Sequence, residues 1–209
     1  MVEDSIKHLK KSDPFIKPLI PLAALYELRE PNSLFQALSR SIIGQQLSVK
    51  VAAVIWSRFL DLFPANELTP SEILSQSDET LRSIGLSGSK SQYIKNVAVY
   101  FQDTRPVDFN WGKLSDAEIL TELTQIKGVG EWTVQMLLLF TLRRTDIWPV
   151  KDLGIQQSFA KYFNFDEKGK GLIDLMNETS ERWRPHRSAV SLALWKWKDL
   201  GYPPLKSHK

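Results

Sequence analysis

Apolar residues recur at helical spacing along most of the chain, and runs that alternate between polar and β-branched residues are rare. The clearest helical pattern covers residues 34–63, where the polar insert Gly44-Gln45-Gln46 predicts a junction between two helices. Residues 13–30 contain three prolines, so we expect turns and one short helix there. The pattern as a whole predicts an all-α protein.

Short polar motifs mark several helix starts. Thr69-Pro70-Ser71-Glu72 and Ser115-Asp116-Ala117-Glu118 both have the capping-box pattern, in which a hydroxyl residue stands three positions before a glutamate. Ser87-Gly88-Ser89 is expected to begin a helix that continues through Phe101. The helices expected in the rest of the chain cover residues 131–143, 153–163, 171–182 and 185–200.

Composition narrows the class of protein. With 209 residues, of which 43% are hydrophobic, the chain can form one domain or two closely packed subdomains. Its net charge of +3 and pI near 9.0 permit a nucleic-acid partner without requiring one.

The absence of cysteine excludes disulfides, thiolate zinc sites and cysteine-ligated iron–sulfur clusters, and the three histidines are too scattered for a metal centre. Because we find neither a signal peptide nor a long apolar run, we expect a soluble intracellular protein.

Two glycines mark a tight turn between helices at Ile126-Lys127-Gly128-Val129-Gly130. Glycine permits a positive φ and allows another backbone to approach closely. Since a helix begins at this hairpin, we expect the amides of Gly128, Gly130 and Thr133 to point outward, where they could bind a phosphate. The alternative is that the glycines serve only the geometry of a turn.

A single aspartate, Asp152, precedes the helix expected at residues 153–163. Aspartate is a common N-cap, and this role alone could account for it. A capping carboxylate is also held in one orientation, and the helix dipole keeps it ionised. Such a group can stabilise a sugar cation and orient water at an anomeric carbon.

Three separated motifs resemble, in their order along the chain, the helix-hairpin-helix DNA glycosylase superfamily and within it the bacterial 3-methyladenine DNA glycosylase II type. They lie at residues 35–48, at 123–133 followed by 148–154, and at 182–195. The resemblance covers about residues 34–197.

The resemblance implies one all-α folding unit with two helical subdomains flanking a cleft. The first would be a helical barrel over about residues 31–143 that contains the hairpin, and the second would combine residues 1–30 with 148–209. Asp152 would lie in the cleft. The chain resembles a short form that has no N-terminal β-rich domain.

The resemblance also implies roles for individual residues. Asp152 would be the catalytic aspartate of a monofunctional glycosylase, which flips alkylated purines out of DNA and hydrolyses their N-glycosidic bond in base excision repair. Trp132 stands where strand-cleaving relatives carry a lysine that forms a Schiff base, so water is the expected nucleophile. The base pocket would consist of Trp132, Trp195 and Met136, because an indole face attracts a cationic base. The DNA-binding residues would be Gly128, Gly130, Thr133, Gln45, Gln46 and Ser48.

Two details of the expected site stay open. Either Gln46, at the position that matches the family's wedge, or Gln45 could fill the gap left by a flipped base. In the family, hairpin carbonyls often hold Na⁺ or K⁺, and the matching positions are Thr124, Ile126 and Val129. No other cofactor is expected to be required. Three tryptophans on apolar helical faces are expected to be core residues: Trp56, Trp183 and Trp197.

The expected partner is double-stranded DNA with damaged bases, bound by a monomer without membrane contact. The compartment would be the cytoplasm, at the nucleoid, of a bacterium or archaeon, or the nucleus of a eukaryote. Two other functions stay open: a non-catalytic helix-hairpin-helix DNA-binding module and an oxidised-base glycosylase with lyase activity. The sequence does not choose among 3-methyladenine, 7-methylguanine, ethenoadenine and hypoxanthine as the preferred base.

Overall fold

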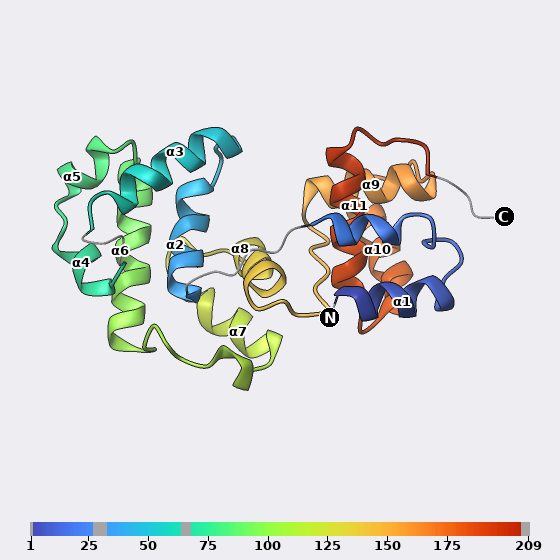
Figure 1. Ribbon diagram of the computed structural model, residues 1–209, viewed down its shortest axis with the longest axis horizontal. Helices are drawn as coiled ribbons and strands as arrows, with labels where there is room; N and C mark the ends of the chain where they lie inside the picture. Colours follow the sequence, from blue (N-terminus) through green and yellow to red (C-terminus); the bar gives the residue numbers. More distant parts are fainter. Residues whose placement is uncertain (1, 27–32, 64–67, 206–209) are drawn as a thin grey trace. The chain divides into compact units, whose positions relative to one another are not determined.

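The computed structural model describes residues 2–26, 33–63 and 68–205, which form helices joined by short connections (Figure 1). No strand occurs in these three ranges, which confirms the predicted all-α class. None of the helices described there is long and apolar enough to cross a membrane. Internal contacts divide the chain into two compact units, which are described separately below.

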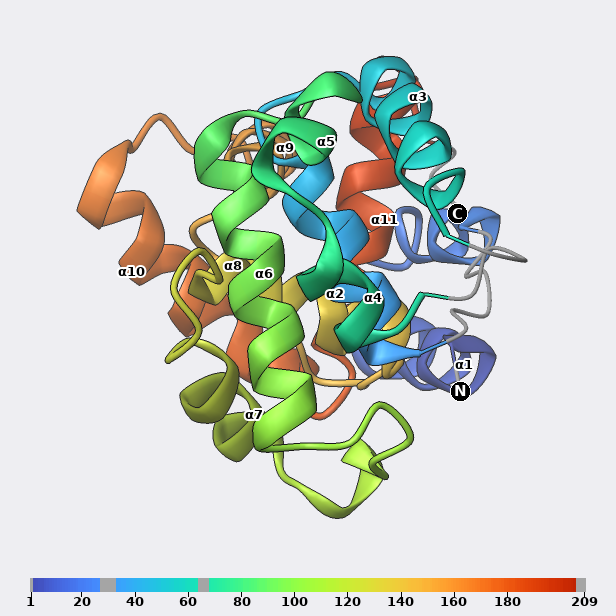
Figure 2. The same ribbon diagram turned by 90° about the vertical axis from the view of Figure 1, so that its left-hand side faces the viewer.

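Unit 2, Glu30–Leu137, is organised around one long helix, α6 (Gly88–Asp103). This helix packs against α2, α4 and α5, and Figure 2 shows it running along this group of helices. The buried face of α6 includes Ile94, Val97 and Phe101. The other α-helices of the unit are α2 (Leu34–Gly44), α3 (Val49–Leu60), α4 (Pro70–Ser75), α5 (Asp78–Ser83), α7 (Asp116–Leu123) and α8 (Glu131–Met136).

Local hydrogen bonds define the ends of these helices where the sequence predicts them. Both capping boxes form: the hydroxyls of Thr69 and Ser115 accept an amide of the first turn, and the glutamate three positions later accepts the N-cap amide. Ser87 caps α6, and α2 ends at Gly44. The predicted junction between two helices at this glycine is therefore confirmed.

Unit 1 combines Met1–Arg29 with Leu138–Lys209. Its central helix is α11 (Arg187–Asp199), most of whose residues are buried. The elements packed on α11 are α1 (Val2–Ser12), the 3₁₀ helix η1 (Ile20–Leu25) and α9 (Leu153–Phe163), and α9 in turn contacts α10 (Gly169–Ser180). The short helix η1 confirms the expectation for residues 13–30.

Helix α1 was not predicted from the sequence. Its apolar stripe is short, since among its hydrophobic residues only Ile6 and Leu9 are buried, and charged residues occupy most of the rest. Such a stripe becomes a helix because the unit provides an apolar surface for it to cover, which is a tertiary effect.

The helix expected at residues 131–143 is different in the structure. Helix α8 ends at Met136, and a π-helical segment, Leu137–Thr141, follows it. A π-turn changes the hydrogen-bond pattern without changing which residues are apolar, so hydrophobic periodicity does not reveal it.

The division between the units falls between Leu137 and Leu138, earlier than the boundary expected near residue 143. The reason is packing: Phe140 lies against Tyr26 and Trp195, which both belong to unit 1. The other expected boundary, near residue 30, lies outside the described residues.

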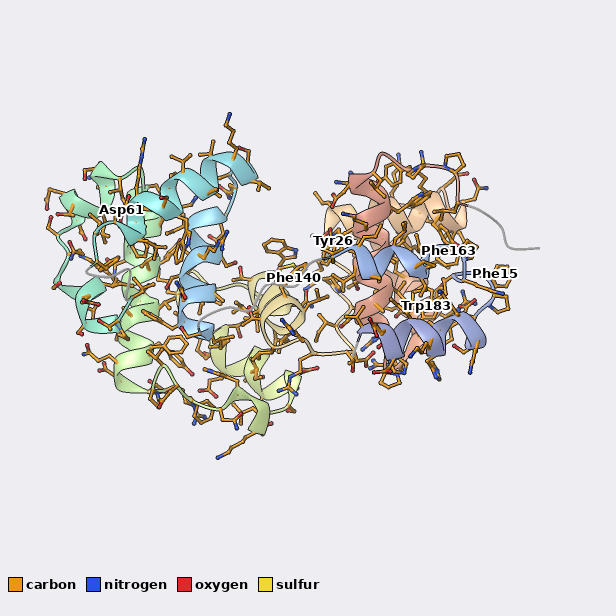
Figure 3. The ribbon with its side chains drawn as sticks, viewed as in Figure 1. Phe15, Tyr26, Asp61, Phe140, Phe163 and Trp183 are labelled. Carbon is orange, nitrogen blue, oxygen red and sulfur yellow. The ribbon has the colours of Figure 1, made fainter. Side chains whose placement is uncertain are left out.

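The tryptophans expected in the core are buried. Trp56, Trp183 and Trp197 are at most 9% exposed, which confirms that expectation. Trp183 lies among aromatic rings that include Phe163, both labelled in Figure 3. Its indole N–H donates to the buried carboxylate of Asp13 at 2.7 Å, so the one polar atom of this large side chain is satisfied.

Candidate functional site

The glycine hairpin of unit 2 connects α7 to α8, and Gly128 has a conformation that only glycine adopts easily. Its φ is +104°, and a Cβ at this position would lie 2.2 Å from Cγ of Tyr93. The turn is closed by the amide of Val129, which donates to the carbonyl of Ile126 at 2.9 Å. The geometry of this turn therefore requires glycine at position 128.

Gly130 differs from Gly128 in a way that matters for ligand access. It is the N-cap of α8, with φ of −96°, and a Cβ there would meet no other atom within 4 Å. In α8, the first backbone amide that donates to a carbonyl four residues earlier is that of Val134, and its acceptor is the carbonyl of Gly130. The amide of Thr133 precedes this bond and lies in the first turn of α8, the end of a helix at which backbone amides can bind anions.

The Gln45–Gln46 turn joins α2 to α3 and contacts the hairpin. The side-chain amide of Gln45 donates to the carbonyl of Gly128 at 3.3 Å and, over 3.5 Å, to the hydroxyl of the buried Thr133. Gln46 is exposed and has φ of +60°. Ser48 caps α3 by accepting the amide of Val51. Gln46 is therefore the glutamine that faces solvent, whereas Gln45 holds the turn against the hairpin.

Trp132 and Met136 lie one helical turn apart on α8. Because they are four residues apart, they share one face of the helix. Trp132 is 43% exposed and Met136 is half-buried, so this face presents an indole and a thioether at the surface of unit 2.

In unit 1, Asp152 is the N-cap of α9, as the sequence predicts. Its Oδ1 accepts the amide of Ile155 at 2.9 Å. The same oxygen accepts the indole N–H of Trp195, also at 2.9 Å, and Trp195 belongs to α11. Two donors from different helices fix the orientation of this half-buried carboxylate.

Three residues around Asp152 were not identified from the sequence. The ring of Phe140 stacks on Trp195 with centroids 5.8 Å apart, and the ring centroid of Tyr26 lies 6.1 Å from that of Phe140. Tyr26 and Phe140 are labelled in Figure 3. At Gly154, a Cβ would lie 3.0 Å from Oδ1 of Asp152 and 3.3 Å from the indole of Trp195. A glycine two positions after the aspartate was the one available signal, because it indicates close approach of another group.

Electrostatics around Asp152 also involve Tyr26. Burial, the hydrogen bond that its hydroxyl donates to Asp199 and the charges of Asp199 and Asp152 together raise the pKa of Tyr26 well above its usual value. Tyr26 therefore stays neutral and presents an uncharged ring on this side of Asp152.

The connector before Asp152, residues 146–151, is hydrogen-bonded to α11, the helix that carries Trp195. Arg187 on α11 binds both oxygens of Asp146, at 2.7 and 2.9 Å. Ser188 accepts the amide of Ile147, and Ser191 donates to the carbonyl of Ile147. Because the connector and α11 share these bonds, the chain before Asp152 is held in register with α11.

Among known proteins, a family model described as "HhH-GPD superfamily base excision DNA repair protein" matches residues 39–185. The DNA-3-methyladenine glycosylase 1 of Schizosaccharomyces pombe is 33% identical over 201 residues, which are 92% of this chain and 86% of that protein.

Solved structures give the same result. The 3-methyladenine DNA glycosylase of S. pombe in complex with abasic DNA has a TM-score of 0.81 and 30% identity, and the match covers 96% of this chain and 99% of that one. A DNA-3-methyladenine glycosidase from Bacillus halodurans has a TM-score of 0.76 and 30% identity over 92% of this chain and 88% of that one.

Proposed function

Because this chain belongs to the HhH-GPD superfamily of base excision DNA repair proteins, we propose that it is a DNA-3-methyladenine glycosylase. It hydrolyses the N-glycosidic bond of alkylated purines. The observation that carries this proposal is the orientation of Asp152, whose Oδ1 is held by the amide of Ile155 and the indole of Trp195. A carboxylate fixed in this way can stabilise positive charge on a sugar without reorganising.

In the proposed reaction the C1′–N bond breaks, and its electron pair leaves with the base. A base that carried a positive charge leaves neutral, so it is a good leaving group. Positive charge develops on the deoxyribose, where Asp152 stabilises it, and water adds to C1′ with loss of a proton. The products are free base and an abasic site.

The two exposed or half-buried indoles are the groups that we assign to the alkylated base. Trp132, with Met136 on the same helix face, and Trp195 can each present a π-face, which attracts a cationic ring more strongly than a neutral one. This preference would select bases that carry charge as a result of damage.

Binding of the DNA strand is assigned to unit 2. The hairpin amides at Gly128, Gly130 and Thr133 bind a phosphate, and Gln46 fills the gap left by the flipped base. The carbonyl of Ile126 accepts the amide of Val129 and keeps a second lone pair, so it can also join Thr124 and Val129 in holding a monovalent cation. That ion would add to a turn that closes without it, and we propose no other cofactor.

The two rival functions make different predictions. Lysine is absent from position 132, where tryptophan stands, so a Schiff base is not expected there. With no cysteine in the chain, a cysteine-ligated iron–sulfur cluster is also excluded. A DNA-binding module without activity would not need the fixed carboxylate of Asp152.

One assay tests the proposal. We expect the purified protein, incubated with methylated double-stranded DNA, to release methylpurines that mass spectrometry identifies, and borohydride to trap no covalent DNA adduct. Binding without base release would support the non-catalytic module, and a trapped adduct would support the lyase.

Replacing Trp195 with phenylalanine is expected to slow excision about tenfold. Phenylalanine keeps an aromatic ring against Phe140 but removes the N–H that orients Asp152. Single-turnover rates on methylated DNA measure this effect, and affinity for undamaged duplex should change little.

Trp197→Phe is the matched control, because Trp197 lies on the same helix and donates its indole N–H to the carbonyl of Pro203 instead. Equal rates for the Trp195 and Trp197 variants would contradict an orienting role for Trp195.

A further inference from the structure

Three side chains on α6 reach the two loops to which DNA binding was assigned. Lys90, Tyr93 and Asn96 are spaced three residues apart, so they lie along one side of the helix. Lys90 reaches the Gln45–Gln46 turn, whereas Tyr93 and Asn96 reach the hairpin. None of the three was singled out from the sequence.

Lys90 binds backbone. Its ammonium donates to the carbonyls of Ile43 and Gln45, at 2.8 and 2.7 Å, and thereby satisfies two acceptors at the C-terminal end of α2. A cation is favourable at this end of a helix, where the dipole is negative. Burial lowers the pKa of Lys90, in agreement with an ammonium that is partly withdrawn from solvent.

The hairpin rests on the same helix. The ring of Tyr93 fills the space where a side chain at Gly128 would stand, and Asn96 donates to the carbonyl of Lys127 at 3.0 Å. Gln45 completes the connection, because its side chain bridges the turn and the hairpin through Gly128 and Thr133. The turn and the hairpin are thus joined to each other and to α6.

We propose that Lys90 is a positioning residue. It holds the Gln45–Gln46 turn in a fixed position relative to the hairpin, so that the side chain of Gln46 can enter the base stack. This inference rests on the proposed function. Extruding a base costs a few kcal/mol of stacking and pairing. The turn that carries Gln46 must therefore keep its position while the side chain enters the base stack. Without the ammonium, the carbonyl of Ile43 in α2 and that of Gln45 in the turn lose their donor, and the turn can move when Gln46 meets the base stack.

The test compares Lys90→Met with Lys95→Met. Lys95 lies on the same helix and pairs with Asp78, so its variant removes an equal charge elsewhere. On methylated duplex we expect excision by Lys90→Met to be about tenfold slower than by the wild type, and excision by Lys95→Met to be unchanged. On the same DNA made single-stranded, where no opposing stack has to be opened, the Lys90→Met defect should shrink to less than about twofold.

A second readout does not depend on activity. On a duplex with a tetrahydrofuran abasic analogue opposite 2-aminopurine, wedge insertion changes the fluorescence, and Lys90→Met should lose about half of this change or more. If Lys90→Met does not fold, Gln45→Met, which cuts the bridge to the hairpin, should show the same pattern.

Three outcomes would overturn the inference. The first is excision and fluorescence at wild-type level in Lys90→Met. The second is a defect of equal size on single-stranded and duplex DNA. The third is a salt dependence of duplex binding weakened by about one unit of slope, which would make Lys90 a phosphate ligand. Failure of the proposed function would give a different result, because the wild type would then release no methylpurine. The fluorescence and salt measurements on Lys90→Met do not depend on base release, so they would still test the role of Lys90.

Discussion

Replacing Asp152 with asparagine is expected to slow the release of methylated purines about 1000-fold, or ~4 kcal/mol of transition-state stabilisation. Asparagine has nearly the same shape, and its oxygen can still accept the amide of Ile155 and the indole N–H of Trp195. The substitution therefore removes the negative charge while leaving the geometry in place. Single-turnover excision from methylated DNA measures the effect, and affinity for DNA should stay within a few-fold of the wild type.

Asp174→Asn is the control for this experiment. Asp174 is an exposed carboxylate on α10 of the same unit, and its loss should leave excision unchanged. Release of methylpurines by Asp152→Asn at the wild-type rate would show that another group stabilises the sugar cation.

The second large effect concerns stability. Gly128→Ala is expected to lower the free energy of unfolding by about 2–5 kcal/mol, because strain and overpacking add. The backbone φ of +104° is unfavourable for alanine, and the new methyl group would stand 2.2–2.6 Å from atoms of Tyr93. Chemical denaturation followed by circular dichroism measures the loss.

Two further variants separate the causes. In a Tyr93→Ala background Cγ and Cδ1 are removed while Cβ, 2.6 Å from the new methyl group, remains, so the steric part should shrink and Gly128→Ala should cost less there than in the wild type. Gly130→Ala should change stability by less than about 1 kcal/mol, because its φ of −96° suits alanine and no atom lies near the new methyl group. It should nevertheless weaken DNA binding, since the methyl group would stand where a phosphate is proposed to approach.

An unchanged denaturation midpoint for Gly128→Ala would contradict the packing argument.

Helix boundaries were predictable because their signals are short. The capping boxes at Thr69 and Ser115, the N-cap at Ser87 and the cap at Asp152 each depend on an amide three residues away. A hydrogen bond over so short a distance in sequence forms whenever the segment becomes helical, whatever surrounds it.

The sequence did not predict, or predicted only in part, the elements that depend on partners far away in the chain. Helix α1 needs the surface that it covers, and the π-helical segment after Met136 is invisible in the apolar pattern. For the site, the sequence indicated Trp195 and Asp152 separately but not the bond between them, and it did not indicate Tyr26 or Phe140. Gly154 belongs to the motif at residues 148–154, but only the structure shows that a side chain there would crowd the indole of Trp195 and the carboxylate of Asp152.

The sequence by itself determined the helical class, the glycine hairpin and the capped aspartate, because each follows from hydrogen bonds and periodicity within a few neighbouring residues. The tertiary structure alone decided that Trp195 binds Asp152 over a separation of 43 residues and that Lys90 binds the Gln45–Gln46 turn over a separation of 45 residues. Such contacts depend on how helices pack, and packing is set by the whole set of buried surfaces and not by any local pattern.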